Sequence, residues 1–447
     1  MPASKKSASS SSRLNSRSAQ IFERARKVLP GGTSRQATYA SPFPIYMRSG
    51  RGARVVDVDG VERIDFNNNY TAAIHGYGHP AIEKVVMEQV RNGTGFSFAT
   101  EKEVELAEIL CERVPSIEKI RFQNSGTECV MWAIKAARAY TGRPKVAKCE
   151  GAFHGSYDYA EVSLESSPDN WGSEDKPEAI AYTKGTPQHM LDDVVVIPFN
   201  DVPRAEKILN AAKHTLSCVL IDPVANRAGM ISATKEFLDF LRTFCTRNGV
   251  LLISDEVLCF RLGYHGAQGE FGLDPDMTCL AKIIGGGFPI GAVGGRDEFM
   301  SVFDPTKGKA KVPQSGTYSG NPVTMAAGAE SMRLLTRDVF DRINALGERA
   351  RQGLRRAIKE SGANGQVTGR GSLFRIHMHD RTLTGYRSQY PKPEERQRLA
   401  QLCEYLLDHG VIIAPTGMCA ITTPMTDADI DQLVDTVGQG LTTLKLA

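Results

Sequence analysis

Short apolar runs and amphipathic stretches alternate through the middle of the chain, from about residue 82 to residue 297. The apolar runs are short and rich in β-branched residues, which is typical of strands buried on both faces of a sheet. The stretches between them repeat their apolar positions with the period of a helix. This alternation predicts a parallel sheet covered by helices. The predicted strands are KIRFQN, PKVAKCE, DVVVIPF, SCVLIDPV and VLLISDEV, and the predicted helices are TECVMWAIKAARAYTG, RAEKILNAAKH and TKEFLDFLRTFCTRNG.

The pattern changes on both sides of this region. Before it, residues 19–29 read as an amphipathic helix, and two strand-like pieces meet at the turn Asp59-Gly60. After about residue 326, a long helical region leads into GQVTGRGSLFRIHM, which predicts an antiparallel hairpin, and further helices follow. We therefore predict a smaller α+β domain beside the large one. The division is a disordered tail at 1–18, an N-terminal segment of the small domain at 19–80, the large α/β domain at 81–325 and the C-terminal small domain at 326–447.

Composition narrows the class of protein. The chain has 447 residues and a formal charge of +3, which requires neither nucleic acid nor a membrane surface as partner. Its nine cysteines form no C-x-x-C pair, which favours a reducing compartment, and we expect a cytoplasmic protein. His377 and His379 form an H-x-H pattern, but no other ligands cluster beside them in sequence, so we predict no metal site.

The first 18 residues are rich in serine, carry basic residues and contain no acid. Such a segment cannot bury enough apolar surface to order itself, which predicts a disordered tail. The same composition is typical of an organellar transit peptide, and this alternative stays open.

The segment FQNSGTECVM has the pattern of a phosphate site. A predicted strand ends at Phe122, and Asn124-Ser125-Gly126-Thr127 opens a helix. Backbone N–H groups at a helix N-terminus, with a glycine that allows close approach, can bind a phosphate. The same residues could instead serve only as a helix cap.

Two further segments carry candidate chemistry. The apolar run VLLIS ends in Asp255 and Glu256, and a carboxylate at the end of a sheet strand points toward a ligand site unless it caps the next helix. Beneath a pyridine nitrogen, Asp255 would keep that nitrogen protonated. Lys282 has apolar neighbours and precedes Gly285-Gly286-Gly287. Burial lowers the pKa of a lysine and produces the neutral amine that a Schiff base needs, whereas the alternative is an ordinary surface lysine.

A phosphate site, an acid for a pyridine and a Schiff-base lysine are the parts of a pyridoxal 5'-phosphate site. The sequence also resembles the class III (ω-type) aminotransferases, in the branch that holds glutamate-1-semialdehyde aminomutase and β-phenylalanine aminotransferase. The resemblance covers roughly residues 20–440 and implies the aspartate-aminotransferase-like fold of pyridoxal-phosphate enzymes. It rests on PGGTSR, VVDVDGVERIDF, GYGHPAI, NSGTE, GAFHG, SDEV, LAKIIGGGFPIGAVGG, SGTYSGNP and TDADID.

The resemblance implies a role for individual residues. Lys282 forms the Schiff base and shuttles the proton, and Asp255 pairs with the pyridine nitrogen. Thr317 completes the phosphate site of the partner subunit, so a homodimer with a shared active site is expected. One departure is Asp222-Pro223, where relatives have Glu-Pro, which leaves Asn226 as the candidate for the phenolic oxygen of the cofactor. The other implied cofactor-binding residues are Ser125, Gly126, Thr127, Phe153, His154 and Val257.

The substrate is predicted from two segments. The spacing of Arg35 in LPGGTSRQATYASPFPIY resembles that of the β-phenylalanine aminotransferases, and a guanidinium can clamp a carboxylate through two hydrogen bonds. Arg35 could instead be an ordinary surface arginine. Those enzymes use a second arginine where this chain has Thr416, which leaves Arg375, Arg261 and Arg227 as alternative cations.

These observations predict an enzyme that moves an amino group from a β-amino acid or related amine to a 2-oxo acid, pyruvate or 2-oxoglutarate. A glutamate-1-semialdehyde 2,1-aminomutase and a simple amine transaminase are the alternatives within the family. A relative that binds ligands or partners without catalysis is a third, which the presence of Lys282 and Asp255 argues against.

Overall fold

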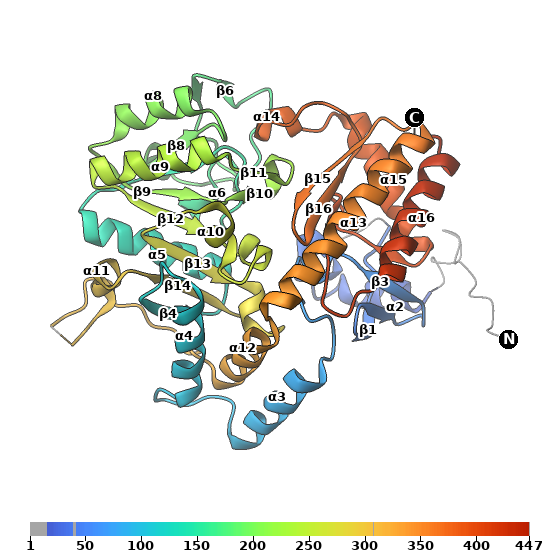
Figure 1. Ribbon diagram of the computed structural model, residues 1–447, viewed down its shortest axis with the longest axis horizontal. Coiled ribbons are helices and arrows are strands. Elements are labelled where there is room, and N and C mark those ends of the chain that lie inside the picture. Colours follow the sequence, from blue (N-terminus) through green and yellow to red (C-terminus); the bar gives the residue numbers. More distant parts are fainter. Residues whose placement is uncertain (1–15, 39–41, 307, 447) are drawn as a thin grey trace.

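The computed structural model describes residues 16–38, 42–306 and 308–446. Its largest feature is a seven-stranded sheet in the order β4-β14-β13-β12-β9-β5-β8 (Figure 1). Strand β14 runs antiparallel to both of its neighbours and the other pairs are parallel, so the predicted large, mostly parallel sheet is confirmed. The strands are β4 (Lys119–Gln123), β5 (Lys145–Cys149), β8 (Val194–Ile197), β9 (Leu216–Ile221), β12 (Leu251–Asp255), β13 (Met277–Ala281) and β14 (Gly291–Gly295).

Helices cover both faces of this sheet. Along β9, Cys218 and Leu220 pack with helix α5 (Gly126–Thr141), whereas Val219 and Ile221 pack with α8 (Val202–Ala212) and α9 (Lys235–Asn248). Alternate side chains of a strand point to opposite faces, so both rows are buried. Burial of each large apolar side chain contributes about 1.5–3 kcal/mol, which explains the continuous apolar runs of the sequence.

Two strands of this sheet, β13 and β14, were not among the predicted strands, and β14 is the less apolar of the two, because its sequence GAVGG contains three glycines. A Cβ on Gly291 would collide with the carbonyl oxygen of Ser125. The missing side chain therefore lets the start of α5 lie close against the sheet.

The structure has two smaller sheets of four and three strands, and the first of them combines segments from both ends of the chain. The first has the order β1-β2-β3-β17, and β17 pairs with β3 in parallel. The second has the order β15-β16-β18, in which β15 and β16 form the predicted antiparallel hairpin. Their strands are β1 (Met47–Arg51), β2 (Arg54–Asp57), β3 (Glu62–Asp65), β15 (Gln366–Arg370), β16 (Leu373–His377), β17 (Val411–Ile412) and β18 (Met418–Ala420).

Two helix predictions differ from the structure. The helix expected at 19–29 is α2 (Arg17–Ala25), which begins earlier because Ser16 caps it and because the Asp59 carboxylate accepts hydrogen bonds from its first N–H groups. The region expected to be one long helix from residue 326 is divided into α12 (Pro322–Leu334) and α13 (Arg337–Ser361). Thr336 interrupts it, since its side chain accepts a hydrogen bond from Val339 N and caps α13.

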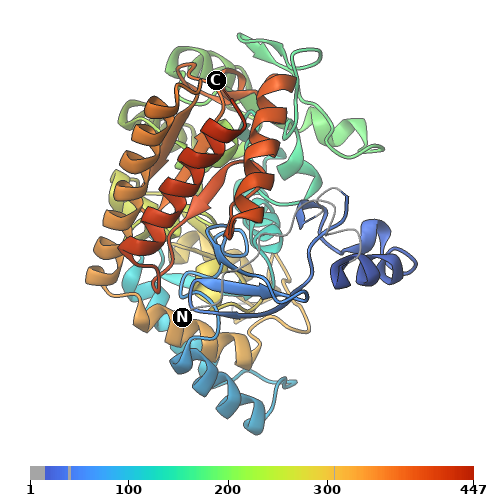
Figure 2. The ribbon, with the colours of Figure 1, turned by 90° about the vertical axis from the view of Figure 1, so that its right-hand side faces the viewer.

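The helices near the C-terminus form a layer in which α13, α15 and α16 lie side by side (Figure 2). Residues 1–15 of the predicted tail lie outside the described residues. Within the described ranges, none of the helices combines the length and the apolar character needed to cross a membrane. The remaining elements are α3 (Pro80–Asn92), α4 (Glu101–Arg113), α6 (Asp158–Glu161), α7 (Gln188–Asp192), α10 (Gly266–Phe271), α11 (Asp297–Met300), α14 (Tyr386–Gln389), α15 (Pro393–Asp408), α16 (Asp427–Thr443), β6 (Gly172–Ser173), β7 (Lys176–Pro177), β10 (Val224–Ala225) and β11 (Ile231–Ser232).

Candidate active site

The carboxyl ends of five strands, β4, β5, β9, β12 and β13, meet at one edge of the seven-stranded sheet. Ligands of open α/β sheets bind at such an edge. All but one of the cofactor-site residues predicted from the sequence follow one of these ends, directly or after a short turn. They are Ser125, Gly126 and Thr127 after β4, Phe153 and His154 after β5, Asn226 after β9, Asp255 and Val257 at the end of β12, and Lys282 after β13; Thr317 lies elsewhere in the chain.

Asp255 is held by two hydrogen bonds. Its Oδ2 lies 2.7 Å from His154 Nδ1, and its Oδ1 accepts a hydrogen bond of 3.0 Å from Val257 N. Burial lowers the pKa of His154, so the ring is neutral and donates from Nδ1 to the carboxylate. His154 Nε2 is buried and has no hydrogen-bond partner within the described residues.

The side chain of the neighbouring acid, Glu256, contacts the start of a helix instead of the sheet edge. Its carboxylate accepts hydrogen bonds from Ala267 N at 2.6 Å and from Gln268 N at 3.1 Å, at the start of α10. Burial raises the pKa of Glu256 to about 7. Of the two acids that end the apolar run, Glu256 therefore caps a helix, and Asp255 faces the sheet edge.

Lys282 begins the turn after β13 in an unusual backbone conformation. Its φ of 53° lies in the left-handed region, which costs a residue with a side chain about 1–2 kcal/mol. Burial lowers the pKa of its amine, while the nearby carboxylates of Asp255 and Asp222 act in the opposite direction. The amine of Lys282 is thus partly buried beside both carboxylates.

Asp222 belongs to this group, although the sequence pointed to it only as a departure from relatives. It follows β9, and the register pairs Ile221 with Ser254, so Asp222 stands beside Asp255 on the same face of the sheet. Burial and the charge of Asp255 raise the pKa of Asp222 well above its usual range. The sequence signal for Asp222 is an acid directly after the apolar run SCVLI, and the same pattern identified Asp255.

The start of α5 has the features that an anion site requires. Ser125 caps the helix by accepting a hydrogen bond of 3.2 Å from Glu128 N, and Thr127 Oγ1 accepts one of 3.1 Å from Ser156 N. A Cβ on Gly126 would lie 3.1 Å from Val257 Cγ1, so a side chain there would crowd the site. The N–H groups of the first turn have no partners within the helix, and the helix dipole favours an anion there. Capping and anion binding are therefore compatible.

The remaining predicted cofactor residues are Phe153, Asn226 and Thr317. Phe153 is 55% exposed, and the end of the Asn226 side chain is buried at Oδ1 without a partner in the described structure. Thr317 is exposed, in a segment where the site of a Cβ on Gly316 lies 4.0 Å from Asn124 Nδ2 of the same chain. The phosphate site of this chain and the Thr317 segment are thus near each other at the surface.

These residues fit pyridoxal phosphate. The cofactor needs a site for its phosphate, an acid for its ring nitrogen and an amine for its aldehyde, and the start of α5, Asp255 and Lys282 provide them at one sheet edge. The two buried atoms without partners, His154 Nε2 and Asn226 Oδ1, leave hydrogen-bonding positions for a bound group.

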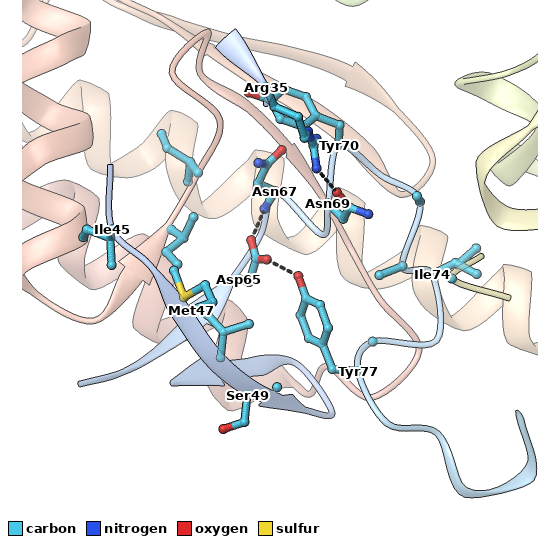
Figure 3. Close-up of a pocket in the computed structure, with 18 of the residues that line it drawn as sticks. Arg35, Ile45, Met47, Ser49, Asp65, Asn67, Asn69, Tyr70, Ile74 and Tyr77 are labelled. Atoms are coloured by element: carbon cyan, nitrogen blue, oxygen red, sulfur yellow. Dashed lines mark hydrogen bonds between the residues drawn. The ribbon is translucent and has the colours of Figure 1, made fainter. Parts of the chain in front are cut away.

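Arg35 lies apart from this edge, in a cavity of about 1050 Å³ (Figure 3). Its Nη1 donates a hydrogen bond of 2.6 Å to Asn69 Oδ1, and its guanidinium lies 5.2 Å from the centre of the Tyr70 ring. The cavity reaches Gly286, Gly287 and Phe288, which continue the turn of Lys282, but neither Lys282 nor Asp255 lines it. The cavity that Arg35 lines therefore extends to the residues that follow the turn of Lys282.

The wall of the cavity beside Arg35 is strained. Four successive residues, from Asn68 to Thr71, have φ between 52° and 73°, in the left-handed region that residues with side chains rarely adopt. Asp65 accepts a hydrogen bond of 3.0 Å from Asn68 N, and Arg261 donates one of 3.2 Å to Thr71 O. Strain of this kind is frequent at functional sites, and here it shapes the surface that faces Arg35.

The three alternative cations have different surroundings. Arg261 is fully buried and donates to Ser372 Oγ and to the carbonyls of Thr71 and Ile421, so it has a structural role. Arg227 pairs with Glu165 at 2.8 Å. Arg375 donates to the carbonyl oxygen of Thr416.

His377 and His379 do not form a metal site with other ligands. Their ring centres are 5.3 Å apart, and His377 Nε2 lies 2.9 Å from Thr368 Oγ1. Across the described ranges, no cluster of three or more His, Cys, Asp or Glu side chains is arranged to hold a metal ion.

Comparisons with known proteins agree with this geometry. The family model described as Aminotransferase class-III matches residues 36–441. A glutamate-1-semialdehyde 2,1-aminomutase of Methanothermobacter thermautotrophicus is 35% identical over 432 residues, which cover 96% of this chain and 100% of that protein. The crystal structure of an omega-transaminase from Sphaerobacter thermophilus is 49% identical, with a TM-score of 0.94, and the match covers 96% of this chain and 97% of the other. A β-phenylalanine aminotransferase from Variovorax paradoxus is 32% identical, with a TM-score of 0.85 and coverage of 96% and 94%.

Proposed function

The chain belongs to the class-III aminotransferases, which are pyridoxal-phosphate enzymes, and we propose that it moves an amino group from a β-amino acid or related amine to a 2-oxo acid such as pyruvate or 2-oxoglutarate. The predicted family, fold and cofactor are confirmed by the match. The convergence of Lys282, Asp255 and the start of α5 at one sheet edge carries the proposal of amino transfer. When bound, the cofactor withdraws electrons from the carbon that loses its proton.

The central catalytic and cofactor-binding roles in this proposal belong to residues at the sheet edge. Lys282 Nζ would hold the aldehyde of the cofactor and would move the proton, because burial lowers the pKa of Lys282 and favours the neutral amine. Asp255 holds the proton on the ring nitrogen, and His154 orients that carboxylate. The N–H groups of Gly126 and Thr127, in the turn capped by Ser125, bind the phosphate.

The outer positions complete the proposed site. Phe153 and Val257 would pack against the cofactor ring. The Asn226 amide bonds the phenolic oxygen, which its unpartnered Oδ1 supports, because the side chain can turn its NH₂ group to that place. Thr317 contributes to the phosphate site of a second copy of the chain.

A homodimer is supported by exposed apolar side chains near Thr317. Phe98 is 88% exposed and Tyr318 is 66% exposed. Large apolar side chains gathered on one surface mark an interface, and a second copy would bury them. Asn321 Nδ2 donates a hydrogen bond of 2.8 Å to Thr94 O, which brings the segment of Phe96 and Phe98 beside that of Tyr318. The other large exposed apolar side chains of helices α3 and α4 are Met87, Val90 and Val104.

A cytoplasmic location is supported by the cysteines. All nine are described, and all are free thiols. Thiols persist in a reducing compartment, which agrees with an enzyme of the cytoplasm.

The β-amino acid donor is supported by Arg35 and by the relative from Variovorax paradoxus. Arg35 lies in a cavity that reaches the turn of Lys282, where a carboxylate two carbons from the amine could extend. A guanidinium binds such a carboxylate through two parallel hydrogen bonds. We therefore assign the donor carboxylate to Arg35.

The aminomutase is the second candidate, favoured by the relative from Methanothermobacter thermautotrophicus, which this chain matches over its whole length. A panel of donors separates the candidates, with pyruvate and 2-oxoglutarate as acceptors. We expect 3-amino-3-phenylpropanoate and 3-aminobutanoate to react faster than alanine and 1-phenylethylamine. Turnover of glutamate-1-semialdehyde alone, without an acceptor, would establish the aminomutase instead. If 1-phenylethylamine were the best donor, the protein would be a simple amine transaminase.

A further inference from the structure

Arg375 is a buried cation without an anion beside it. It lies in the middle of β16 with a side chain only 9% exposed. Its Nε donates a hydrogen bond of 2.9 Å to Thr416 O, and its Nη1 donates one of 2.8 Å to Asn226 O. Within residues 16–38, 42–306 and 308–446, no carboxylate forms an ion pair with it, and Nη2 makes no hydrogen bond to these residues but is accessible to solvent. A buried charge is costly unless it is paired, so this position calls for an anion.

The surroundings of Arg375 reinforce this need. Burial and the neighbouring Arg227 lower the pKa of Arg375 to about 10, which still leaves it charged at neutral pH. Arg227 is itself paired with Glu165. His377, on the same strand, is neutral, because burial lowers its pKa to about 3. No negative charge in the described structure offsets that of Arg375.

The location of Arg375 connects the two parts of the proposed site. Asn226 belongs to the turn that follows Asp222, and Asp222 lies beside Lys282 and Asp255. Thr416 belongs to the turn at 414–417, and its neighbour Pro415 lines the cavity of Arg35. The hydrogen bonds of Arg375 therefore join the sheet edge to the wall of the cavity. Figure 1 shows β16 close to β10, the strand that leads into the Asn226 turn.

We propose that Arg375 binds the carboxylate of the 2-oxo acid at the junction of the sheet edge and the cavity. This inference rests on the proposed aminotransferase activity and names a second residue that determines its specificity. The two main-chain carbonyls fix the Nε–Nη1 edge of the guanidinium, and Nη2 presents N–H groups to the carboxylate. With Arg35, the site then has two cations, which suits two substrates whose carboxylates lie at different distances from the reacting carbon.

The test measures binding without turnover. Calorimetry on the pyridoxal-phosphate form of the enzyme gives the Kd of 3-phenylpropanoate, a donor analogue without an amine, and of 2-oxoglutarate, which has no amino group to exchange in this form. Arg375→Met should weaken the binding of 2-oxoglutarate by about 10- to 100-fold, the range of a lost charged hydrogen bond, and should leave the binding of 3-phenylpropanoate unchanged. Arg349→Met, at a half-exposed arginine paired with Asp431, is the control and should change neither by more than about threefold. Equal binding of both probes by wild type and Arg375→Met would overturn the proposal.

Two further measurements separate ligand binding from a structural role. Bound 2-oxoglutarate should raise the unfolding temperature of the wild type but not that of Arg375→Met. A merely structural residue would instead lower the unfolding temperature of the variant and leave both Kd values unchanged. If Arg375→Met does not fold, Arg375→Lys keeps the charge but loses the planar guanidinium, and unchanged binding by that variant would also overturn the proposal. Because no turnover is needed, failure here is distinct from failure of the donor panel.

Discussion

His154 Nδ1 lies 2.7 Å from Asp255 Oδ2, and this hydrogen bond joins the loop after β5 to the end of β12. The other oxygen of Asp255 is held by Val257 N. Both oxygens are therefore oriented by the protein itself, and a group that is fixed in advance stabilises charge without the cost of reorganising. Orientation of this kind is what an acid needs in order to keep a proton on a ring nitrogen.

Asp255→Asn should reduce kcat by about 10²–10³-fold, because an amide cannot supply the negative charge that holds the ring proton. The cofactor should still bind, since the start of α5 and Lys282 are unchanged. Steady-state turnover with the best donor and the visible absorbance of the purified protein measure the two effects. Turnover close to that of the wild type would refute the role of Asp255.

Lys282→Ala should abolish the covalent attachment of the cofactor and multiple-turnover amino transfer. Borohydride reduction followed by denaturation and dialysis detects the attachment. Lys235, whose side chain is 80% exposed and paired with Asp239, provides the control variant Lys235→Ala, which should behave as wild type. A covalent adduct that survives in Lys282→Ala would exclude the assignment.

Arg35→Ala should lower the affinity for donors that carry a carboxylate by about 10- to 100-fold, because it removes a charged hydrogen bond. KM for 3-amino-3-phenylpropanoate measures this effect, and KM for 1-phenylethylamine should not change. Arg51→Ala, at an exposed arginine near Glu83, is the control. An equal effect on both donors would mean that Arg35 supports the cavity wall rather than the carboxylate.

Phe98→Ser should weaken the proposed homodimer, since the Phe98 ring is 88% exposed in the single chain and its burial would contribute about 1.5–3 kcal/mol. Sedimentation velocity over a range of concentrations measures the association. Tyr182→Ser, at a 44% exposed tyrosine, should leave it unchanged. A fully active monomeric wild type would contradict both the dimer and the shared role of Thr317.

The stability of the protein should fall as the pH falls from 6.5 to about 4. Burial lowers the pKa of His75 to about 4, and the neutral ring bonds to Ser331 O and Thr423 Oγ1. The unfolded chain binds more protons in this window, so the free energy of unfolding decreases by on the order of 3 kcal/mol through His75.

Urea unfolding at pH 7 and pH 5 measures this dependence. His75→Gln keeps a donor for Ser331 O but does not titrate, so the difference between the two pH values should shrink. His409→Gln, at an exposed histidine, should leave the difference unchanged. An unchanged difference in His75→Gln would show that other groups cause the loss of stability.

Strands and helix starts that depend only on the residues of one segment could be predicted from the sequence. The five apolar runs became strands of one sheet because continuous burial requires continuous apolar residues. The pattern of Asn124 to Thr127 predicted a helix start, and Asp255 and Lys282 stand where strands end. Since the carboxyl ends of parallel strands meet at one edge, the order of these residues along the chain is enough to group them at one site.

Contacts between segments that are far apart in the sequence could be known only from the folded structure. The pairing of β3 with β17, the glycine strand β14, the place of Asp222 beside Asp255 and the contact of Arg375 with Thr416 depend on register and packing, which no local pattern encodes. The folded structure also separates two neighbouring acids, because Glu256 caps the start of α10 whereas Asp255 lies at the sheet edge beside His154. A side chain acquires its charge state and its partners from everything that surrounds it, and most of those neighbours come from elsewhere in the chain.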